Sequence, residues 1–152
     1  MKTIIAHRGL LEGPNKELEN RPDQLLKALQ YGFDIEVDVW YNDDGLFLGH
    51  DEPQYPIDGH IRSFVFDRRA WVHAKNIETM VHLMNNFKSS NVFYHTDENV
   101  VLTSKGYMWA HPIYRIEHAV CVLPELYPDM PIPGNAFGIC TDYALKYSET
   151  HT

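Results

Sequence analysis

The sequence predicts an α/β protein built as a compact, trimmed (β/α)8 barrel of the TIM type, with several crossover helices missing or shortened. Two observations carry this prediction. Short apolar runs of strand length follow one another along the whole chain, and a titratable or hydrogen-bonding side chain closes each run. The runs cover residues 3–9, 33–40, 46–52, 71–76, 91–98, 106–112, 119–125 and 137–143.

The polar residues at the ends of the runs indicate parallel strands that meet at one rim. Parallel strands covered on both faces are almost wholly apolar. In a (β/α)8 barrel the exception is the carboxyl-terminal rim, where active sites are built. The residues concerned are His7 and Arg8, Glu36 and Asp38, His50 and Asp51, His73 and Lys75, His95 and Asp97, His111, Glu125 and Asp142.

The chain length limits how many helices such a barrel can hold. Barrels of this type usually need at least ~200 residues, whereas this chain has 152. We therefore expect one domain over residues 1–152, with helices after the first and fourth runs and little helix elsewhere. The exposed strand flanks of a helix-poor barrel could be covered by a homo-oligomer.

Two segments have the pattern of helices. Residues 20–32 offer Asn20 as a possible N-cap, Pro22 in the first turn and Gly32 as a stop. Residues 76–87 place apolar side chains at helical spacing behind Asn76. One short helical turn is expected within residues 97–106. The segment 144–152 is expected to be a helix end or a loose tail.

Composition narrows the classes of function. A net charge of −8 argues against a nucleic-acid-binding protein, which should carry a basic patch. No apolar run approaches the ~18 residues of a membrane span. The apolar run at the N-terminus is too short for a signal peptide, so the expected location is the cytoplasm. Cys121 and Cys140 lie in apolar runs, as buried free thiols would.

The stretch FDIEVDVWYNDDGLFLGHDE, residues 33–52, raises a question of chain direction. Glu36 and Asp38 lie two residues apart and so share one face of a strand. Such a pair suits a hard divalent cation, although a solvent-facing strand edge would also explain it. A hairpin turning at 42–45 would pair residue 37 with residue 50 and turn His50 away from both carboxylates. An extended return followed by another parallel strand is therefore favoured.

Several segments together resemble the glycerophosphodiester phosphodiesterase family, whose members have a phospholipase-C-like barrel. The matching segments are AHRG (6–9), ENRPDQLLKAL (19–29), DIEVDVWYNDDGLFLGHDEP (34–53), WVHAKN (71–76) and GICTDY (138–143). The likeness is close in the N-terminal third and then limited to strand ends. The combination of H-R-G, E-x-D and H-D is more specific than any one of them.

The resemblance implies a role for each matching residue. His7 and His50 would be the general acid/base pair, and the substrate's own hydroxyl could attack to give a cyclic phosphate. A divalent cation, Mg²⁺ or Ca²⁺ in this family, would be bound by Glu36 and Asp38. The remaining roles would be phosphate binding by Arg8 and Lys75 and support from Asn20. Asp51 could orient His50 or bind the metal directly, and the sequence favours orientation.

Two departures from the family pattern affect the expected metal and substrate. His73 stands where the family has a third acidic ligand, and imidazole favours Mn²⁺ or Zn²⁺ over Mg²⁺ or Ca²⁺. The family's inserted subdomain is reduced here to residues 52–70, which opens the site to larger, sugar-linked diesters. Possible substrate contacts are Trp109, His95 and Asp142.

The expected function is therefore metal-dependent hydrolysis of a small-molecule phosphodiester, either glycerophosphodiester-like or sugar-linked. One alternative is a non-catalytic phosphosugar- or phosphodiester-binding protein that keeps the fold and part of the motif. A metal-dependent aldolase or isomerase is a further alternative, but no residue pattern supports it.

Overall fold

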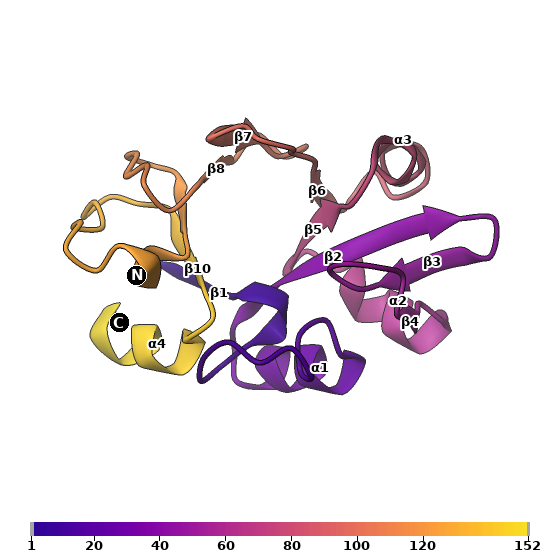
Figure 1. Ribbon diagram of the computed structural model, residues 1–152, viewed down its shortest axis with the longest axis horizontal. Helices are drawn as coiled ribbons and strands as arrows, with labels where there is room; N and C mark the ends of the chain where they lie inside the picture. Colours follow the sequence, from indigo (N-terminus) through magenta and orange to yellow (C-terminus); the bar gives the residue numbers. More distant parts are fainter. Residues whose placement is uncertain (1, 152) are drawn as a thin grey trace.

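The computed structural model describes residues 2–151, and its main feature is one curved, open sheet of mixed strand direction (Figure 1). Seven strands run parallel in the spatial order β8-β9-β10-β1-β2-β5-β6, and β7 adds to β8 in the antiparallel direction. The strands are β1 (Thr3–Ala6), β2 (Asp34–Asn42), β3 (Gly45–Leu48), β4 (Tyr55–Pro56), β5 (Ala70–Ala74), β6 (Asn91–Phe93), β7 (Val100–Leu102), β8 (Met108–Ala110), β9 (Val120–Val122) and β10 (Gly138–Thr141).

The prediction of a TIM-type (β/α)8 barrel is wrong, because the sheet is neither closed nor all-parallel. Within the described residues no ladder joins β6 to β7. The two are linked instead through Ser104, whose backbone N–H donates to the Val92 carbonyl at 2.8 Å and whose hydroxyl accepts from the Val92 N–H at 3.0 Å. The molecule is an α/β protein with an open half-barrel sheet.

The favoured path through residues 41–50 is also wrong, since β2 and β3 form an antiparallel hairpin. Asn42 pairs with Gly45, which leaves a two-residue turn at Asp43-Asp44. Gly45 has a φ of 120°, and the side chain of Asn42 accepts a hydrogen bond from the Asp44 N–H. The local chemistry of this turn reverses the chain, so the expected third parallel strand lies outside the half-barrel, beside β4.

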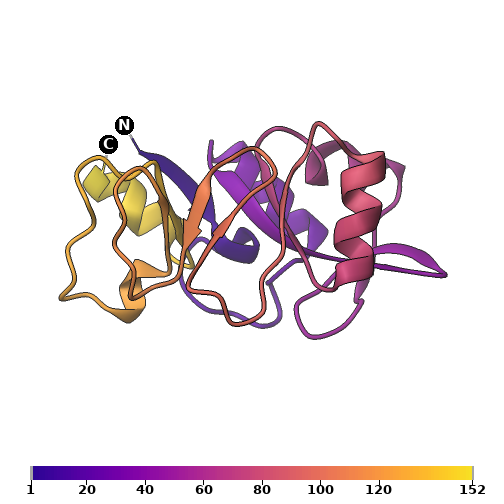
Figure 2. The ribbon, with the colours of Figure 1, turned by 90° about the horizontal axis from the view of Figure 1, so that it is seen from above.

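Four α-helices are present in the described residues, together with two 3₁₀ turns. The helices are α1 (Pro22–Gln30), α2 (Gly59–Val65), α3 (Ile77–Asn86) and α4 (Ala144–His151), and the turns are η1 (His7–Gly9) and η2 (Pro124–Leu126). The α-helices lie outside the curved sheet (Figure 1), with α3 and α4 towards opposite ends of the molecule (Figure 2).

The helices predicted for residues 20–32 and 76–87 are confirmed as α1 and α3. The Asn76 side chain caps α3 by accepting from the Thr79 N–H at 2.8 Å. Asn20 does not cap α1, because Arg21 occupies the N-cap position. The helical turn expected within residues 97–106 is strand β7 instead, and the possible loose tail from residue 144 is α4 through residue 151.

Helix α2 contradicts the expectation of little helix elsewhere. Its N-cap is Asp58, whose side chain accepts from the backbone N–H groups of His60 and Ile61. The helix is short, and only Ile61, Phe64 and Val65 give it an apolar face, which packs against the core. The cap was therefore the clearest signal that the sequence offered for it.

Strand alternation divides the apolar residues between two faces of the curved sheet. On β2, Ile35, Val37 and Val39 belong to the larger core cluster under the helices, whereas Glu36 and Asp38 point to the inner face. A smaller cluster on the inner face contains Ile5, Trp71, Phe93, Trp109, Val120, Val122 and Cys140. This inner cluster closes the floor of the half-barrel beneath the carboxyl ends of the strands.

Two further predictions can be compared with the described residues. Cys121 and Cys140 are buried free thiols, as expected. Across residues 2–151 no helix has the length and apolar character needed to cross a membrane.

Candidate functional site

A cavity of about 460 Å³ lies at the carboxyl ends of the parallel strands. Strands β1, β2 and β5 and the loop after β3 contribute charged and titratable residues, namely His7, Arg8, Glu36, Asp38, His50, His73 and Lys75. Strands β6, β8 and β9 and the segments after them contribute mainly imidazole, aromatic and aliphatic side chains, including Phe93, His95, Trp109, His111 and Leu123. The structure thus gathers all the predicted acid/base, phosphate and metal residues in one place.

Glu36, Asp38 and His73 form a group that could hold a metal ion. Glu36 and Asp38 share the inner face of β2, and the parallel register places His73 of β5 directly beside Asp38. Potential ligand atoms of the three side chains all lie within 4.8 Å of one another. Two carboxylates and one imidazole are a donor set that divalent cations accept, so the residues present fit such an ion.

The buried carboxylate of Asp38 is surrounded by hydrogen-bond donors. Its Oδ2 accepts from Asn20 Nδ2 at 2.8 Å and lies 3.2 Å from Arg8 Nε. Its Oδ1 lies 2.9 Å from His73 Nδ1 and 3.5 Å from Lys75 Nζ. Burial alone would raise the pKa of Asp38, but the His73 hydrogen bond and the charges of Lys75 and Arg8 hold it well below its usual range.

Glu36 is buried in a less compensated environment. Its Oε2 accepts from the Arg8 backbone N–H at 3.1 Å and lies 3.9 Å from His7 Nε2. Burial and the neighbouring Asp38 carboxylate raise the pKa of Glu36. Because a bound cation would relieve both effects, Glu36 is the carboxylate with most to gain from one.

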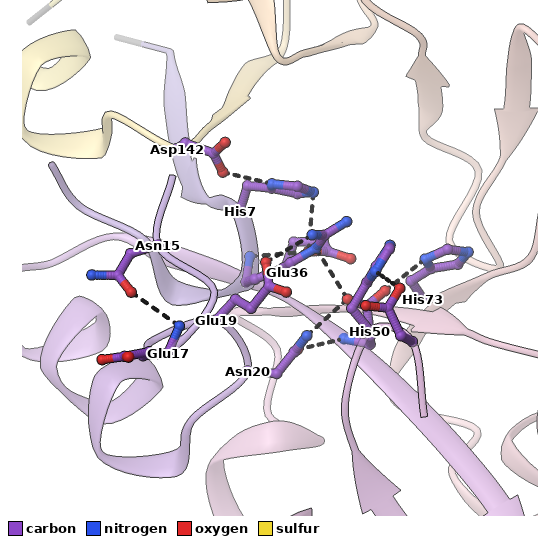
Figure 3. Close-up of polar contacts among 12 residues, drawn as sticks. His7, Asn15, Glu17, Glu19, Asn20, Glu36, His50, His73 and Asp142 are labelled. Carbon is purple, nitrogen blue, oxygen red and sulfur yellow. Dashed lines mark hydrogen bonds and ion pairs between the residues drawn. The ribbon is translucent and has the colours of Figure 1, made fainter. Parts of the chain in front are cut away.

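His7 is held from behind by Asp142. The ring nitrogen Nδ1 of His7 donates to Oδ1 of Asp142 at 2.7 Å, which leaves Nε2 facing Glu36 and the cavity (Figure 3). Burial lowers the pKa of His7, but the Asp142 hydrogen bond and the Glu36 charge outweigh burial and raise it. Asp142 was expected as a substrate contact. Its carboxylate instead accepts a hydrogen bond from His7, and Asp142 does not line the cavity.

Glu125 in turn fixes the position of Asp142. Its Oε1 accepts from the Asp142 backbone N–H at 2.9 Å and from the Thr141 hydroxyl at 3.0 Å. The segment reaches this position because Leu123, at a φ of 45°, turns the chain sharply after β9. Sequence reasoning saw Glu125 only as a strand-end acid, since nothing local connects it with residue 142.

Arg8 and Lys75 carry the positive charge of the cavity. Arg8 has a φ of 51° within η1, and its guanidinium donates to Glu19 at 2.9 Å while facing Asp38. Sequence reasoning missed Glu19 as a partner of Arg8. Lys75 directly follows β5, and its backbone N–H donates to the Val39 carbonyl. Both cations line the cavity, where an anionic group could bind.

Asn20 lies behind the site and binds Asp38 twice. Besides the bond from its Nδ2, its Oδ1 accepts from the Asp38 backbone N–H at 2.9 Å. Asn20 is fully buried and has a φ of 59°, a left-handed conformation that asparagine tolerates better than most residues. This placement matches the supporting position expected for it.

His50 reaches the cavity despite the hairpin that seemed to exclude it. The strand β3 ends at Leu48, and Gly49, at a φ of 152°, departs from the ladder while its N–H donates to the Asp38 carbonyl at 3.2 Å. His50 is thereby released from the face that strand alternation would impose. Its Nδ1 lies 2.8 Å from Oδ1 of the exposed Asp51, an orientation in keeping with the role expected for Asp51.

Three imidazole rings line the cavity wall from β5 to β8. The rings of His73 and His95 stack with centroids 4.4 Å apart, and the His95 and His111 rings meet edge to face at 4.9 Å. Burial and the two neighbouring histidines lower the pKa of His95 to about 4. Trp109 lies behind them, almost fully buried and packed on Phe93 and Trp71. His111 was not among the predicted substrate contacts.

No match to a known family model, a curated protein or a solved structure was found for this chain.

Proposed function

We propose that the protein is a metal-dependent phosphodiesterase that cleaves a glycerophosphodiester-like or sugar-linked phosphodiester. One observation carries the proposal. Two histidines, each oriented by a carboxylate through Nδ1, share a cavity with two cations and a carboxylate–imidazole group. Phosphodiester cleavage needs a base for the attacking hydroxyl, an acid for the leaving oxygen and positive charge around the phosphate oxygens.

The chain's own residues divide these tasks. Arg8 and Lys75 bind the non-bridging oxygens of the diester. His7, whose pKa is raised, stays protonated above the usual pH for histidine and is suited to donate a proton from Nε2 to the leaving oxygen. His50 then accepts the proton of the attacking hydroxyl, which belongs either to water or to the substrate itself. In the latter case the first product is a cyclic phosphate.

A divalent cation held by Glu36, Asp38 and His73 would supply additional charge stabilisation at the phosphate. The imidazole in this donor set favours Mn²⁺ or Zn²⁺ relative to an all-carboxylate site, which would favour Mg²⁺ or Ca²⁺. Asn20 and Arg8 keep the Asp38 carboxylate in place for such an ion.

Phosphorus NMR of a panel of glycerophosphodiesters tests the proposal. The protein is stripped of metal and then supplied with Mg²⁺, Ca²⁺, Mn²⁺ or Zn²⁺ singly. We expect turnover only with a cation and a loss of at least ~100-fold in His7→Ala and His50→Ala. The matched control is His60→Ala, which removes an exposed histidine of α2 that does not line the cavity. Equal turnover in all three variants would contradict the assignment of His7 and His50.

A second candidate function, binding of a phosphodiester without cleavage, is favoured by the surroundings of Asp38. Both of its oxygens already face cationic or amide donors within 3.5 Å. A cation must compete with these donors, whereas an anionic ligand can draw Arg8 and Lys75 away from Asp38. Calorimetry separates the candidates, because the binding protein would hold a glycerophosphodiester equally well in chelator and leave it intact.

A further inference from the structure

The residues that line the cavity after β6 and β8 have no role in the proposed cleavage, although their side chains are held in defined positions. His95 follows β6, and His111 follows β8 directly. Both line the cavity, and the stacking of His95 on His73 and its edge-to-face contact with His111 fix the position of its ring. We call His95 and His111 the histidine pair.

Each ring of the histidine pair carries one buried nitrogen that lacks a partner. Among the described residues, neither Nδ1 of His95 nor Nε2 of His111 makes a hydrogen bond. The Thr96 backbone lies close enough to raise the pKa of His95, but it makes no hydrogen bond with His95 Nδ1. Buried polar atoms without partners are uncommon in folded proteins and need an explanation, such as a ligand that supplies the missing bond.

A hydroxyl group is the ligand chemistry that fits such nitrogens. In a neutral imidazole one nitrogen donates and the other accepts, and a hydroxyl can complement either one because it does both. The carboxylates that line the cavity are Glu36 and Asp38, which lie in the metal-binding group. The nearby Glu98 is exposed and accepts from the Thr96 N–H. Glu98 is close enough to interact electrostatically with both rings of the histidine pair, but it does not line the cavity. A cationic alcohol in the cavity would therefore find no lining carboxylate beside the histidine pair.

Apart from Thr96 and the histidine pair, the lining residues of β6, β8 and β9 and of the segments after them are apolar. Leu123, Leu126 and Pro112 line the cavity near the histidine pair, together with the rings of Phe93 and Trp109. Hydroxyl-binding groups beside an apolar wall suit a sugar or cyclic polyol, which has hydroxyl edges and C–H faces. A cavity of about 460 Å³ has room for a phosphate and a ring of that size.

We propose that the histidine pair binds hydroxyl groups of the alcohol esterified to the phosphate, so that the preferred substrate is the diester of an uncharged, sugar-like polyol. This inference rests on the proposed function, which places the phosphate of the diester beside Arg8 and Lys75. It makes His95 and His111 residues that determine specificity, separate from the acid/base pair.

Three phosphodiesters test the subsite. Glycerophosphoinositol carries a cyclic polyol, glycerophosphocholine carries a cation, and bis(p-nitrophenyl) phosphate carries neither. For each diester kcat/KM is measured, and its dissociation constant is measured by calorimetry with Mg²⁺ and with chelator. The variants are His95→Phe and His111→Phe, which keep a planar ring and remove both nitrogens. His95→Met, which also has no nitrogen in its side chain, replaces His95→Phe if the latter does not fold, and His60→Phe is the matched control.

We expect the wild-type protein to prefer glycerophosphoinositol to glycerophosphocholine. His95→Phe and His111→Phe should lower the ratio of kcat/KM for glycerophosphoinositol to that for bis(p-nitrophenyl) phosphate at least tenfold and weaken glycerophosphoinositol binding similarly. The control should change neither quantity.

The outcomes separate the subsite from the proposed function. Turnover of the diesters with an unchanged ratio in both variants would overturn the subsite and leave the phosphodiesterase standing. Binding of glycerophosphoinositol that the variants weaken, with no diester turned over, would support the subsite and overturn the phosphodiesterase. A preference for glycerophosphocholine, or no binding of any diester, would overturn the subsite.

Discussion

The carboxylate of Asp142 determines which nitrogen of His7 faces the cavity. An ionised carboxylate can only accept, so the 2.7 Å contact makes His7 donate from Nδ1 and leaves Nε2 towards Glu36. The same contact favours the protonated imidazole, which is why the pKa of His7 is raised although burial opposes it. One hydrogen bond to the residue that follows β10 thus sets the orientation and the charge of a residue on η1.

The first prediction concerns Asp142→Asn. The amide keeps the shape of the side chain but loses the negative charge, so we expect the pKa of His7 to fall, since the hydrogen bond to the carboxylate favours the protonated imidazole. NMR titration of the His7 ring nitrogens measures this shift. Asp129→Asn, which changes an exposed acid, is the control. An unchanged His7 titration would show that Asp142 does not set its charge.

Asn20 combines a strained backbone with two hydrogen bonds to Asp38. We predict that Asn20→Ala lowers the free energy of unfolding by about 2–4 kcal/mol, because it leaves buried polar groups unpaired and forces alanine to a φ of 59°. Urea unfolding measures the loss. Asn20→Gly removes the same hydrogen bonds without the backbone strain and should lose less. Equal losses in the two variants would mean that strain contributes nothing.

At the scale of elements, the hairpin of β2 and β3 carries His50 to the cavity, and Gly49 is the residue that allows it. A Cβ at position 49 would lie 2.0 Å from the Glu52 carbonyl oxygen, in addition to the unfavourable φ of 152°. No flexible side chain could relieve this clash, because the nearest atom belongs to the backbone. The segment from residue 49 to residue 54 must therefore move if Gly49 is replaced.

We predict that Gly49→Ala lowers the free energy of unfolding by about 2 kcal/mol or more and removes most diesterase turnover, since it displaces His50. Thermal unfolding and phosphorus NMR measure the two effects. Gly45→Ala is the matched control within the same hairpin, because it also has a positive φ but meets no atom within 4 Å. Similar loss of turnover in both variants would argue against displacement of His50 as the cause.

The elements also show what could be predicted from the sequence. Alternation on β2 correctly placed Glu36 and Asp38 together, because a strand fixes its two faces within a few residues. The position of His50 could not be derived in this way, since a single glycine breaks the alternation after Leu48. The hydrogen bond from the Asp142 N–H to Glu125 joins η2 to the residue after β10. Since its donor is a backbone group, no pattern of residue types predicts it.

At the scale of the whole molecule, the observed half-barrel differs from the predicted barrel in the direction of two strands, because β3 and β7 run antiparallel to their neighbours. Each of the eight predicted runs overlaps one strand, whereas β4 and β7 lie outside them. Strand pairing depends on turns and distant contacts, as in the reversal at Asp43-Asp44 and the antiparallel β7. The parallel part of the sheet nevertheless brings the carboxyl ends of its strands to one cavity. The candidate site needs only this local feature of a barrel, which is why its residues could be predicted although the architecture was wrong.

The site also makes the stability of the whole molecule depend on pH. The pKa of His95 is lowered to about 4 by burial and by His73 and His111, whereas in an unfolded chain it would be about 6.5. Between these values the unfolded chain binds a proton that the folded protein does not. The free energy of unfolding therefore falls as the pH drops from about 6.5 to about 4. Since His95 is only half-buried, we expect this residue to contribute roughly 1–2 kcal/mol.

Urea unfolding at pH 7 and pH 4.5 of the wild-type protein and His95→Phe measures this contribution. The variant lacks the titrating ring, so its free energy of unfolding should fall less than that of the wild type between the two pH values. The pKa of His7 is shifted in the opposite direction and that of Asp38 is lowered, but both groups are present in each protein and cancel in the difference. His60→Phe should behave as the wild type does. An equal fall in His95→Phe and the wild type would show that His95 is not held neutral in the folded protein, so that the histidine pair would present a charge to its ligand.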